Sequence, residues 1–452
     1  MQHFKSINPY TDLELDKYPI MNESDAIDRV VENQKAYREF KSSTLQERQT
    51  LLAKVRDLLL ENKKSLSSLM TAEMGKPQTQ AAAEIEKCAK VCDYYIHCSG
   101  EELADRKVEV DEGEAFVRFE PVGGLLMIMP WNFPFWQVFR VAAPGVLLGN
   151  SLLLKHAPNV QGCSREIVNL FRNAGFGEHF FTDLPVEVPT IEKIINHPHV
   201  QGVTLTGSTK AGSSAASLAG KAIKKSVLEL GGSNPFIVLD DADIDLAVQK
   251  ALQGRMQNTG QSCIAAKRFI VTRKAVESFT EALAEKIKKL KVEDPTLQDA
   301  YIGPMARADL AGELFAQYKA SVKKGAKAVV EPTCDKAHFK PGMLTGVKPG
   351  MPAFDEETFG PLAAVTTAEN KREALELAAK SQFGLGASVF TQNPHDHLDA
   401  IGQLPDGAVF FNDFVKSDPK LPFGGTKLSG YGRELGPEGL VEFANIKTVR
   451  IN

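Results

Sequence analysis

Residues 125–154 read LLMIMPWNFPFWQVFRVAAPGVLLGNSLLL, and this stretch decides the fold. It opens with a continuous apolar run at 125–129, passes through a helix-compatible segment at about 134–148, and ends on a second apolar run at 151–154. Short apolar runs bounded by turn residues are typical of strands that are buried on both faces. The stretch therefore predicts a strand, a helix and a second strand.

The same alternation extends along the rest of the chain. Helices are predicted at 160–173, 209–222, 243–256, 274–290, 307–324, 370–380 and 394–403. Strands are predicted at 203–206, 226–230, 236–239, 268–272, 344–347, 361–367, 386–391 and 407–411. Repeated strand–helix units predict an α/β fold with two domains, each built on an open, mostly parallel sheet.

The two ends of the chain carry different patterns. Residues 23–67 and 78–99 have apolar positions at helical spacing. Residues 107–120, KVEVDEGEAFVRFE, alternate polar and apolar around Asp-Glu-Gly, which predicts an antiparallel hairpin. The tail, 440–452, is strand-like.

Composition excludes several classes of protein. The 452 residues include 53 basic and 57 acidic side chains, so the net charge of −4 gives no basic footprint for nucleic acid. Prolines at 130, 134 and 144 interrupt the apolar region 121–151, so no membrane span is expected. The six cysteines are too sparse for a disulfide scaffold, and the polar start resembles no signal peptide. Free thiols in a reducing cytoplasm are expected.

The candidate binding loops follow the strands that end at Met129, Leu154, Thr206 and Leu230, because open parallel sheets bind ligands at the carboxyl ends of their strands. No GxGxxG, P-loop or HExxH motif occurs. Cysteines and a histidine do cluster at 88–98, but thiols packed on a helix explain them better than a zinc site, so no metal is predicted.

Three residues stand out in these loops and beyond. Cys263 lies in QNTGQSCIAA, 257–266, where polar residues lead in and a helix-compatible run leads out. Backbone dipoles at such a junction favour thiolate, although a buried inert cysteine is equally compatible with the sequence. Glu229 ends an apolar strand, so it is either a general base with a raised pKa or one half of a structural ion pair. Asn132, between two prolines, offers an amide that could hold an oxyanion.

Together these residues resemble the aldehyde dehydrogenase superfamily over essentially the whole chain. The motifs that carry the resemblance are PWNFP at 130–134, TGST at 206–209, LELGG at 228–232, NTGQSC at 258–263, EETFGP at 356–361, and PFGG with SGYGRE at 422–425 and 429–434. They occur in family order, and the KHAPN and GRMQNTGQSC segments are similar to bacterial short-form succinate-semialdehyde dehydrogenases.

The resemblance implies a role for each matching residue. Cys263 would attack the aldehyde as thiolate, Asn132 and the Cys263 backbone N–H would hold the oxyanion, and Glu229 would activate water against the thioester. Lys155 and Glu357 would bind the two riboses, and Ser208 would meet the pyrophosphate. The full set of expected cofactor contacts is Met129, Pro130, Trp131, Lys155, Ala157, Pro158, Gly207, Ser208, Gly231, Glu357 and Phe359.

The cofactor is expected to be NADP or NAD, with dual use open. Pro158 stands where many family members carry a glutamate for the adenosine ribose, so no carboxylate repels a 2′-phosphate. His156 replaces a common proline and is interpreted either as a phosphate contact or as an exposed spectator. The second cysteine that some members use as a redox switch is replaced by Ala265.

The expected substrate site contains Arg140, Trp136, Ser417 and Phe423. Arg140 suits an aldehyde whose far end is a carboxylate, such as succinate semialdehyde, and a structural salt bridge is the alternative. A second family arginine is replaced by Gln257, Arg255 lies nearby, and Asp418 would repel a carboxylate if it faced inward.

Domain boundaries and rival functions complete the expectations. Residues 1–101 and 122–231 would form a cofactor-binding domain, 232–428 a catalytic domain, and 102–121 with 442–452 an oligomerisation element of a homodimer or dimer of dimers. The rivals are a dehydrogenase of glutarate semialdehyde or of a medium-chain or aromatic aldehyde, a CoA-acylating enzyme, and a catalytically silent binding protein.

Overall fold

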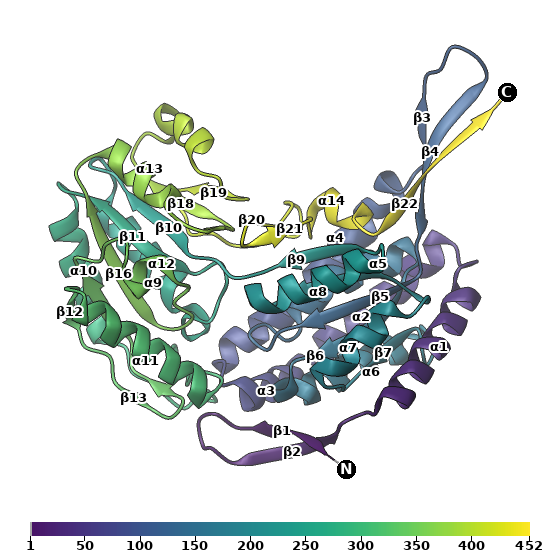
Figure 1. The fold of residues 1–452 in the computed structure, drawn as a ribbon, viewed down its shortest axis with the longest axis horizontal. Coiled ribbons are helices and arrows are strands. Elements are labelled where there is room, and N and C mark those ends of the chain that lie inside the picture. The colour runs from purple at the N-terminus through teal and green to yellow at the C-terminus, as the bar shows by residue number, and fades with distance from the viewer. Residues whose placement is uncertain (1) are drawn as a thin grey trace.

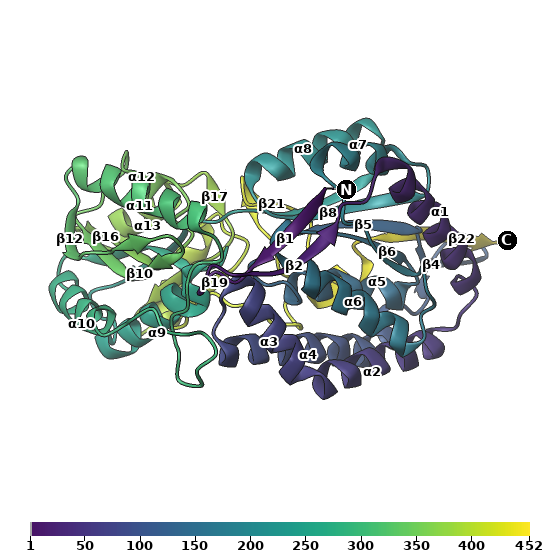
Figure 2. The same cartoon turned by 90° about the horizontal axis from the view of Figure 1, so that it is seen from below.

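The structure, a computed structural model, describes residues 2–452 and contains two open sheets side by side (Figures 1 and 2). The first sheet has the order β21-β9-β8-β5-β6-β7, and every neighbouring pair is parallel except β21 with β9. Its strands are β5 (Gly124–Met129), β6 (Ser151–His156), β7 (Phe181–Asp183), β8 (Val200–Thr206), β9 (Lys225–Glu229) and β21 (Gly430–Tyr431).

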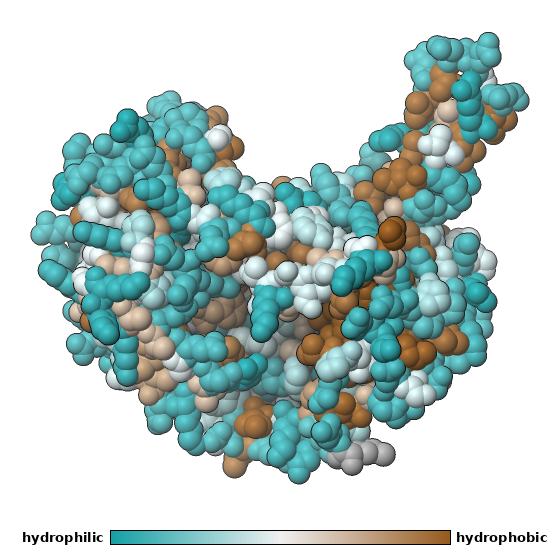
Figure 3. Space-filling model, viewed as in Figure 1, coloured by the Kyte–Doolittle hydropathy of each residue, from teal (hydrophilic) through white to brown (hydrophobic). Residues whose placement is uncertain are grey.

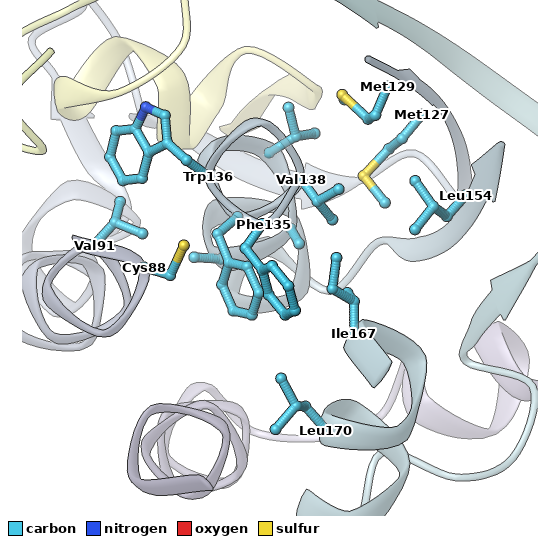
Figure 4. Close-up of a cluster of buried hydrophobic side chains, with 14 of the residues drawn as sticks. Cys88, Val91, Met127, Met129, Phe135, Trp136, Val138, Leu154, Ile167 and Leu170 are labelled. Carbon is cyan, nitrogen blue, oxygen red and sulfur yellow. The ribbon is translucent and has the colours of Figure 1, made fainter. Parts of the chain in front are cut away.

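Helices enclose the first sheet because its central strands are apolar on both faces. In Figure 4, α5 lies between α4 and the sheet: Cys88 and Val91 flank it on one side, and Met127, Met129 and Leu154 on the other. The helices of this half are α1 (Glu23–Phe40), α2 (Leu45–Glu61), α3 (Lys63–Met74), α4 (Gln78–Glu102), α5 (Trp136–Leu148), η1 (Pro158–Val160), α6 (Gln161–Ala174), α7 (Val188–Asn196), α8 (Thr209–Lys221) and α14 (Gly436–Val441).

The second sheet has the order β12-β15-β16-β11-β10-β18-β19, and only β12 with β15 is antiparallel. Its strands are β10 (Asn234–Val238), β11 (Ala266–Thr272), β12 (Lys327–Val330), β15 (Gly342–Thr345), β16 (Leu362–Ala368), β18 (Ala387–Phe390) and β19 (Val409–Phe411). Its helices are α9 (Ile244–Met256), η2 (Gln257–Gly260), α10 (Val276–Lys288), α11 (Ala308–Lys323), α12 (Pro352–Asp355), α13 (Lys371–Ala379) and η3 (Pro394–Gln403). Four two-residue strands pair nearby: β13 (Cys334–Asp335) with β14 (His338–Phe339), and β17 (Phe383–Gly384) with β20 (Thr426–Lys427).

An arm projects from the first half of the molecule (Figure 1). It is a three-stranded antiparallel sheet, β22-β4-β3, made of β3 (Arg106–Val108), β4 (Glu114–Pro121) and β22 (Ala444–Ile451). The arm carries exposed apolar side chains at Val108, Ile446 and Ile451, and Figure 3 shows apolar atoms along it beside a wide concave face.

The α/β fold with two mostly parallel sheets agrees with the sequence-based expectation, and several elements differ. The tail begins as helix α14 and becomes a strand only at Ala444. The sequence did not reveal β7, α7 or the N-terminal hairpin of β1 (His3–Ile7) and β2 (Glu14–Pro19). That hairpin buries only Ser6 and Tyr18, so it has no alternating apolar pattern to detect.

Within residues 2–452, no helix is both long enough and apolar enough to cross a membrane.

Candidate active site

The three catalytic candidates come from three loops at the junction of the two sheets. Asn132 follows β5, and Glu229 is the last residue of β9, where the chain leaves the first sheet. Cys263 lies between η2 and β11 of the second sheet. The site is therefore built where the carboxyl ends of the first sheet's strands face the second sheet.

A strained loop holds Cys263 in place. Asn258 and Thr259 both adopt left-handed backbone angles, with φ of 54° and 53°, and this conformation is a genuine outlier for a β-branched threonine. Thr259 Oγ1 donates to the Gly303 carbonyl at 3.1 Å, and Asn258 Nδ2 donates to the Asn132 carbonyl at 2.8 Å. These bonds fix the cysteine loop against the asparagine loop.

The surroundings of Cys263 correct one expectation. The residues directly after it, 264–265, form a turn that leads into strand β11, predicted at 268–272, and do not start a helix, so the thiol does not lie at a helix N-terminus. Burial is the largest influence and raises the pKa of Cys263 to about 11, while Arg140 and Lys267 oppose that rise. The thiol is therefore protonated at neutral pH in the protein without bound ligands.

Two N–H groups beside the thiol are placed to receive an oxyanion. Asn132 Nδ2 uses one hydrogen to donate to the Gln261 carbonyl at 3.1 Å, which leaves its second hydrogen free. The backbone N–H of Cys263 donates to no group within residues 2–452. Unsatisfied donors in a buried site are what an oxyanion-binding site needs.

Glu229 is a buried carboxylate without a partner. It is 2% exposed, and neither of its oxygens accepts a hydrogen bond from any described residue. Burial and then repulsion from Glu434 raise the pKa of Glu229 well above its ordinary value, against the attraction of Arg140 and Arg433. Such a group is suited to taking a proton from water.

A cavity of about 280 Å³ brings the thiol and the expected substrate residues together, since Cys263, Arg140, Trp136, Ser417 and Phe423 all line it. It is near the lower end of the volumes typical of small-molecule sites, which favours a short substrate.

Arg140 forms an ion pair inside the protein and also lines the cavity. Its Nε lies 2.6 Å from Glu434 Oε2, so the salt bridge of the alternative interpretation exists. Its guanidinium also lies 4.7 Å from the centre of the Phe423 ring and lines the cavity, and its buried Nη2 has no hydrogen-bond partner among the described residues. The ion pair therefore holds Arg140 at the cavity wall without using all its donors.

Two charged residues considered from the sequence, Arg255 and Asp418, fall outside the cavity. Arg255 is fully buried, and its Nη2 donates to the Gly260 carbonyl at 2.6 Å and to the Thr358 carbonyl. Asp418 is exposed and accepts the Lys420 N–H at 2.9 Å. Gln257 does line the cavity and adds no charge.

Lys87, which lines the cavity from α4, was not among the site residues expected from the sequence. Its Nζ donates to Ser417 Oγ at 2.6 Å and lies 4.2 Å from the centre of the Trp136 ring. The signal was present in the sequence, since Gln80, Glu84 and Lys87 repeat at helical spacing in a helix otherwise rich in buried small residues.

The residues expected to contact the cofactor lie along the same junction. Lys155 is 8% exposed at the end of β6, and its ammonium makes no hydrogen bond or ion pair within the described chain. Ser208 caps the N-terminus of α8 by accepting the Ala211 N–H at 3.3 Å, and Gly207 donates to the Glu229 carbonyl at 3.0 Å. An unpaired cation and a helix N-terminus, both at the carboxyl edge of the first sheet, fit a phosphate-bearing ligand.

The second half of this group surrounds Glu357. Its Oε1 accepts the Gly232 N–H at 3.0 Å and pairs with Lys267 Nζ at 2.5 Å. A Cβ on Gly231 would overlap Glu357 Oε2, so any other residue there would displace this carboxylate. Phe359 meets Trp131 edge to face with 5.8 Å between ring centres.

Of the remaining expected contacts, Met129 is the last residue of β5 and Pro130 follows it, while Ala157 and Pro158 follow β6. Pro158 is exposed at the start of η1, with no carboxylate at its position. Nothing in these loops opposes a ribose that carries a 2′-phosphate.

Both interpretations of His156 are wrong. The ring is 1% exposed, with Nε2 placed 3.0 Å from the Pro134 carbonyl and Nδ1 accepting the Ala157 N–H at 2.9 Å. Burial lowers the pKa of His156 to about 4, so the ring is neutral and unsuited to binding phosphate. Its role is to tie the end of β6 to the loop that carries Asn132.

Comparisons with known proteins identify the family of the chain. A probable NADP-dependent succinate-semialdehyde dehydrogenase of Synechocystis sp. is 45% identical over 92% of this chain and 93% of its own length. The Sad succinate semialdehyde dehydrogenase of Escherichia coli K12, named for NAD(P), is 41% identical over 99% of this chain and 97% of its own. The crystal structure of a succinic semialdehyde dehydrogenase from Streptococcus pyogenes with NADP matches with a TM-score of 0.96 and 34% identity over 99% of both chains. The family model described as the aldehyde dehydrogenase family matches residues 1–449, and the chain belongs to this family.

Proposed function

We propose that the protein oxidises succinate semialdehyde to succinate with NADP or NAD as the electron acceptor. The observation that carries the substrate assignment is the position of Arg140, whose guanidinium lines the same small cavity as Cys263 and keeps unused donors. A four-carbon aldehyde acid places its reactive carbon at the thiol and its carboxylate at the cation. The names of the relatives support the same substrate.

The chain's own residues supply the covalent chemistry. Cys263 first gives up its thiol proton to solvent. The thiolate then adds to the aldehyde carbon, and the oxyanion formed accepts hydrogen bonds from the Asn132 amide and from the Cys263 backbone N–H. A bound nicotinamide would supply the oxidation: it would accept the aldehyde hydrogen as hydride, which leaves the substrate as a thioester on Cys263. Glu229 then takes a proton from water, the water oxygen attacks the thioester, and the acid leaves as the thiolate is restored.

The cofactor residues fit either dinucleotide. Lys155, unpaired and nearly buried, and the capped N-terminus of α8 at Ser208 would hold the phosphate and ribose groups, and Glu357 would hold the second ribose. Because Pro158 brings no negative charge, we propose that NADP is accepted at least as well as NAD.

Replacing Asn132 with alanine is expected to lower kcat by about 10²–10³-fold, the usual cost of one lost oxyanion donor. The measurement is the steady-state rate of reduced-cofactor formation, with Asn173→Ala, at an exposed position of α6, as the matched asparagine control. An unchanged kcat in Asn132→Ala would contradict the role.

Replacing Arg140 with leucine is expected to lower kcat/KM for succinate semialdehyde by about 10²-fold, because losing one partner of a buried charge contact costs roughly 2–5 kcal/mol. The rate with hexanal should fall much less. This neutral substrate controls for the effects common to both aldehydes, namely the unpaired Glu434 and the lost attraction of Arg140 for Cys263 and Glu229. Equal losses with both aldehydes would return Arg140 to a purely structural role.

The rival functions make different demands. A CoA-acylating enzyme needs no water-activating base, so the orphaned carboxylate of Glu229 favours hydrolysis. A neutral-aldehyde dehydrogenase would leave Arg140 without a ligand, and glutarate semialdehyde would need one further methylene of length. The same rate comparison across these aldehydes separates them.

Assembly, domains and location are also proposals. The arm, residues 102–121 and 442–452, has unpaired edge strands and exposed apolar side chains. These support association of two or four copies of the chain through the arm, as a dimer or a dimer of dimers. The first sheet, with Lys155 and Ser208, supports assigning cofactor binding to 1–101 and 122–231, and the second supports a catalytic domain at 232–428. Six free thiols support a reducing cytoplasmic location.

A further inference from the structure

Two helices present matching stripes to the substrate cavity. From α4 come Gln80, Ala83, Glu84 and Lys87, and from α5 and the loop before it come Phe133, Trp136, Gln137 and Arg140. Both sets follow the spacing i, i+3, i+4, i+7, so each occupies one helix face. Lys87 Nζ lies 4.2 Å from the centre of the Trp136 ring, and Arg140 is one helical turn after Trp136. Lys87 therefore lies over the indole, and Arg140 lies on the same face of α5, where its guanidinium is 4.7 Å from the centre of the Phe423 ring.

The charge on Arg140 is already offset. Its Nε lies 2.6 Å from Glu434 Oε2, deep in the protein. Arg140 alone thus gives the cavity directional N–H donors but little net positive charge.

Lys87 is different, because within residues 2–452 it forms no ion pair. Its one hydrogen bond is the donation to Ser417 Oγ at 2.6 Å, so two ammonium hydrogens remain for a ligand. Glu84, the nearest carboxylate on α4, is occupied by Lys76 and by the N–H groups of Phe135 and Trp136. A half-buried ammonium without a counter-ion is unfavourable until an anion arrives.

We infer that Lys87, held on Ser417, is the second cation that receives the substrate carboxylate and that it sets the preference for acid-bearing over neutral aldehydes. The inference rests on the proposed function and deepens it. Lys87 supplies the positive charge that the uncharged Gln257 lacks. Arg255 does not supply it to the cavity, because its guanidinium donates to the Gly260 and Thr358 carbonyls.

The preference should depend on pH near 8. Burial and then Arg140 on α5 lower the pKa of Lys87 to about 8, against Cys88 and Glu84 on its own helix and Asp418 on the facing loop. At the rim, Lys416 is paired with Asp413. As pH rises through 8, Lys87 loses its proton and its attraction for a carboxylate, so discrimination should fall.

The test compares kcat/KM for succinate semialdehyde with that for butanal, which has the same carbon count and no carboxylate. Their ratio cancels the titration of Cys263 and Glu229, which act on both substrates. The variants are Lys87→Met, which removes the charge, and Lys87→Arg, which keeps it. Lys90→Met, on the exposed side of the same helix, is the matched control.

Lys87→Met is expected to lower the ratio at least tenfold at pH 7, through KM for succinate semialdehyde, with butanal rates retained. The wild-type ratio should fall between pH 7 and 9, whereas the Lys87→Arg ratio should stay flat. A wild type that prefers succinate semialdehyde, with an unchanged ratio in Lys87→Met, would overturn the inference alone. A wild type without that preference would instead overturn the proposed substrate.

Discussion

Replacing Cys263 with alanine is expected to abolish turnover, with kcat lower by roughly 10⁵–10⁶-fold, the scale of loss seen when a catalytic nucleophile is removed. No other thiol can substitute, because the strained loop and its bonds to the Asn132 loop place only Cys263 in the cavity. The measurement is the initial rate of reduced-cofactor formation, with Cys334→Ala as the matched control, since that thiol lies in the small β13–β14 hairpin.

Alkylation gives a second measure of the same residue. Because the pKa of Cys263 is about 11 in the protein without ligands, its rate of reaction with iodoacetamide should rise steadily with pH up to that value. The proton must be lost for the thiol to react, so the sign of the slope is positive throughout. Substantial turnover by Cys263→Ala, or alkylation that leaves activity intact, would contradict a covalent mechanism.

Replacing Glu229 with glutamine is expected to separate the two halves of the reaction. Formation of the thioester needs no water, so a burst of reduced cofactor close to one per active site should remain. Hydrolysis loses its base, so the steady-state rate should fall by about 10²–10⁴-fold. Rapid mixing with absorbance detection measures both phases, and Glu86→Gln on the surface of α4 is the matched control.

The pH dependence follows from the raised pKa of Glu229. The carboxylate acts as a base only after losing its proton, so wild-type deacylation should speed up as pH rises. Loss of the burst in Glu229→Gln would place the residue in an earlier step, and unaltered turnover would refute the assignment as base.

Local pattern was sufficient for most of the fold. The apolar runs at 125–129 and 151–154 became β5 and β6, because fully buried parallel strands must be apolar on both faces. The N-terminal hairpin was not predicted, because its two strands bury only Ser6 and Tyr18. The short run directly after Cys263 was compatible with a helix because alanine and isoleucine occur in helices and strands alike, whereas β11, predicted at 268–272, begins already at Ala266 through its pairing with β10 and β16.

The site was less predictable, because its properties depend on contacts between distant residues. The Arg140–Glu434 pair joins α5 to the C-terminal segment, and no local pattern announces it. His156 was placed outside the core because histidine is often exposed, whereas its two ring nitrogens are both used in tying β6 to the Asn132 loop. Lys87 reaches the cavity only because α4 packs against α5.

The most direct test of the account compares initial rates with succinate semialdehyde, hexanal and benzaldehyde, each with NAD and with NADP. The account predicts a kcat/KM for succinate semialdehyde at least tenfold above the neutral aldehydes, which corresponds to about 1.4 kcal/mol, and readily measurable rates with NADP. Equal or higher rates with hexanal or benzaldehyde would contradict the substrate assignment and leave an aldehyde dehydrogenase whose Arg140 serves only to hold Glu434.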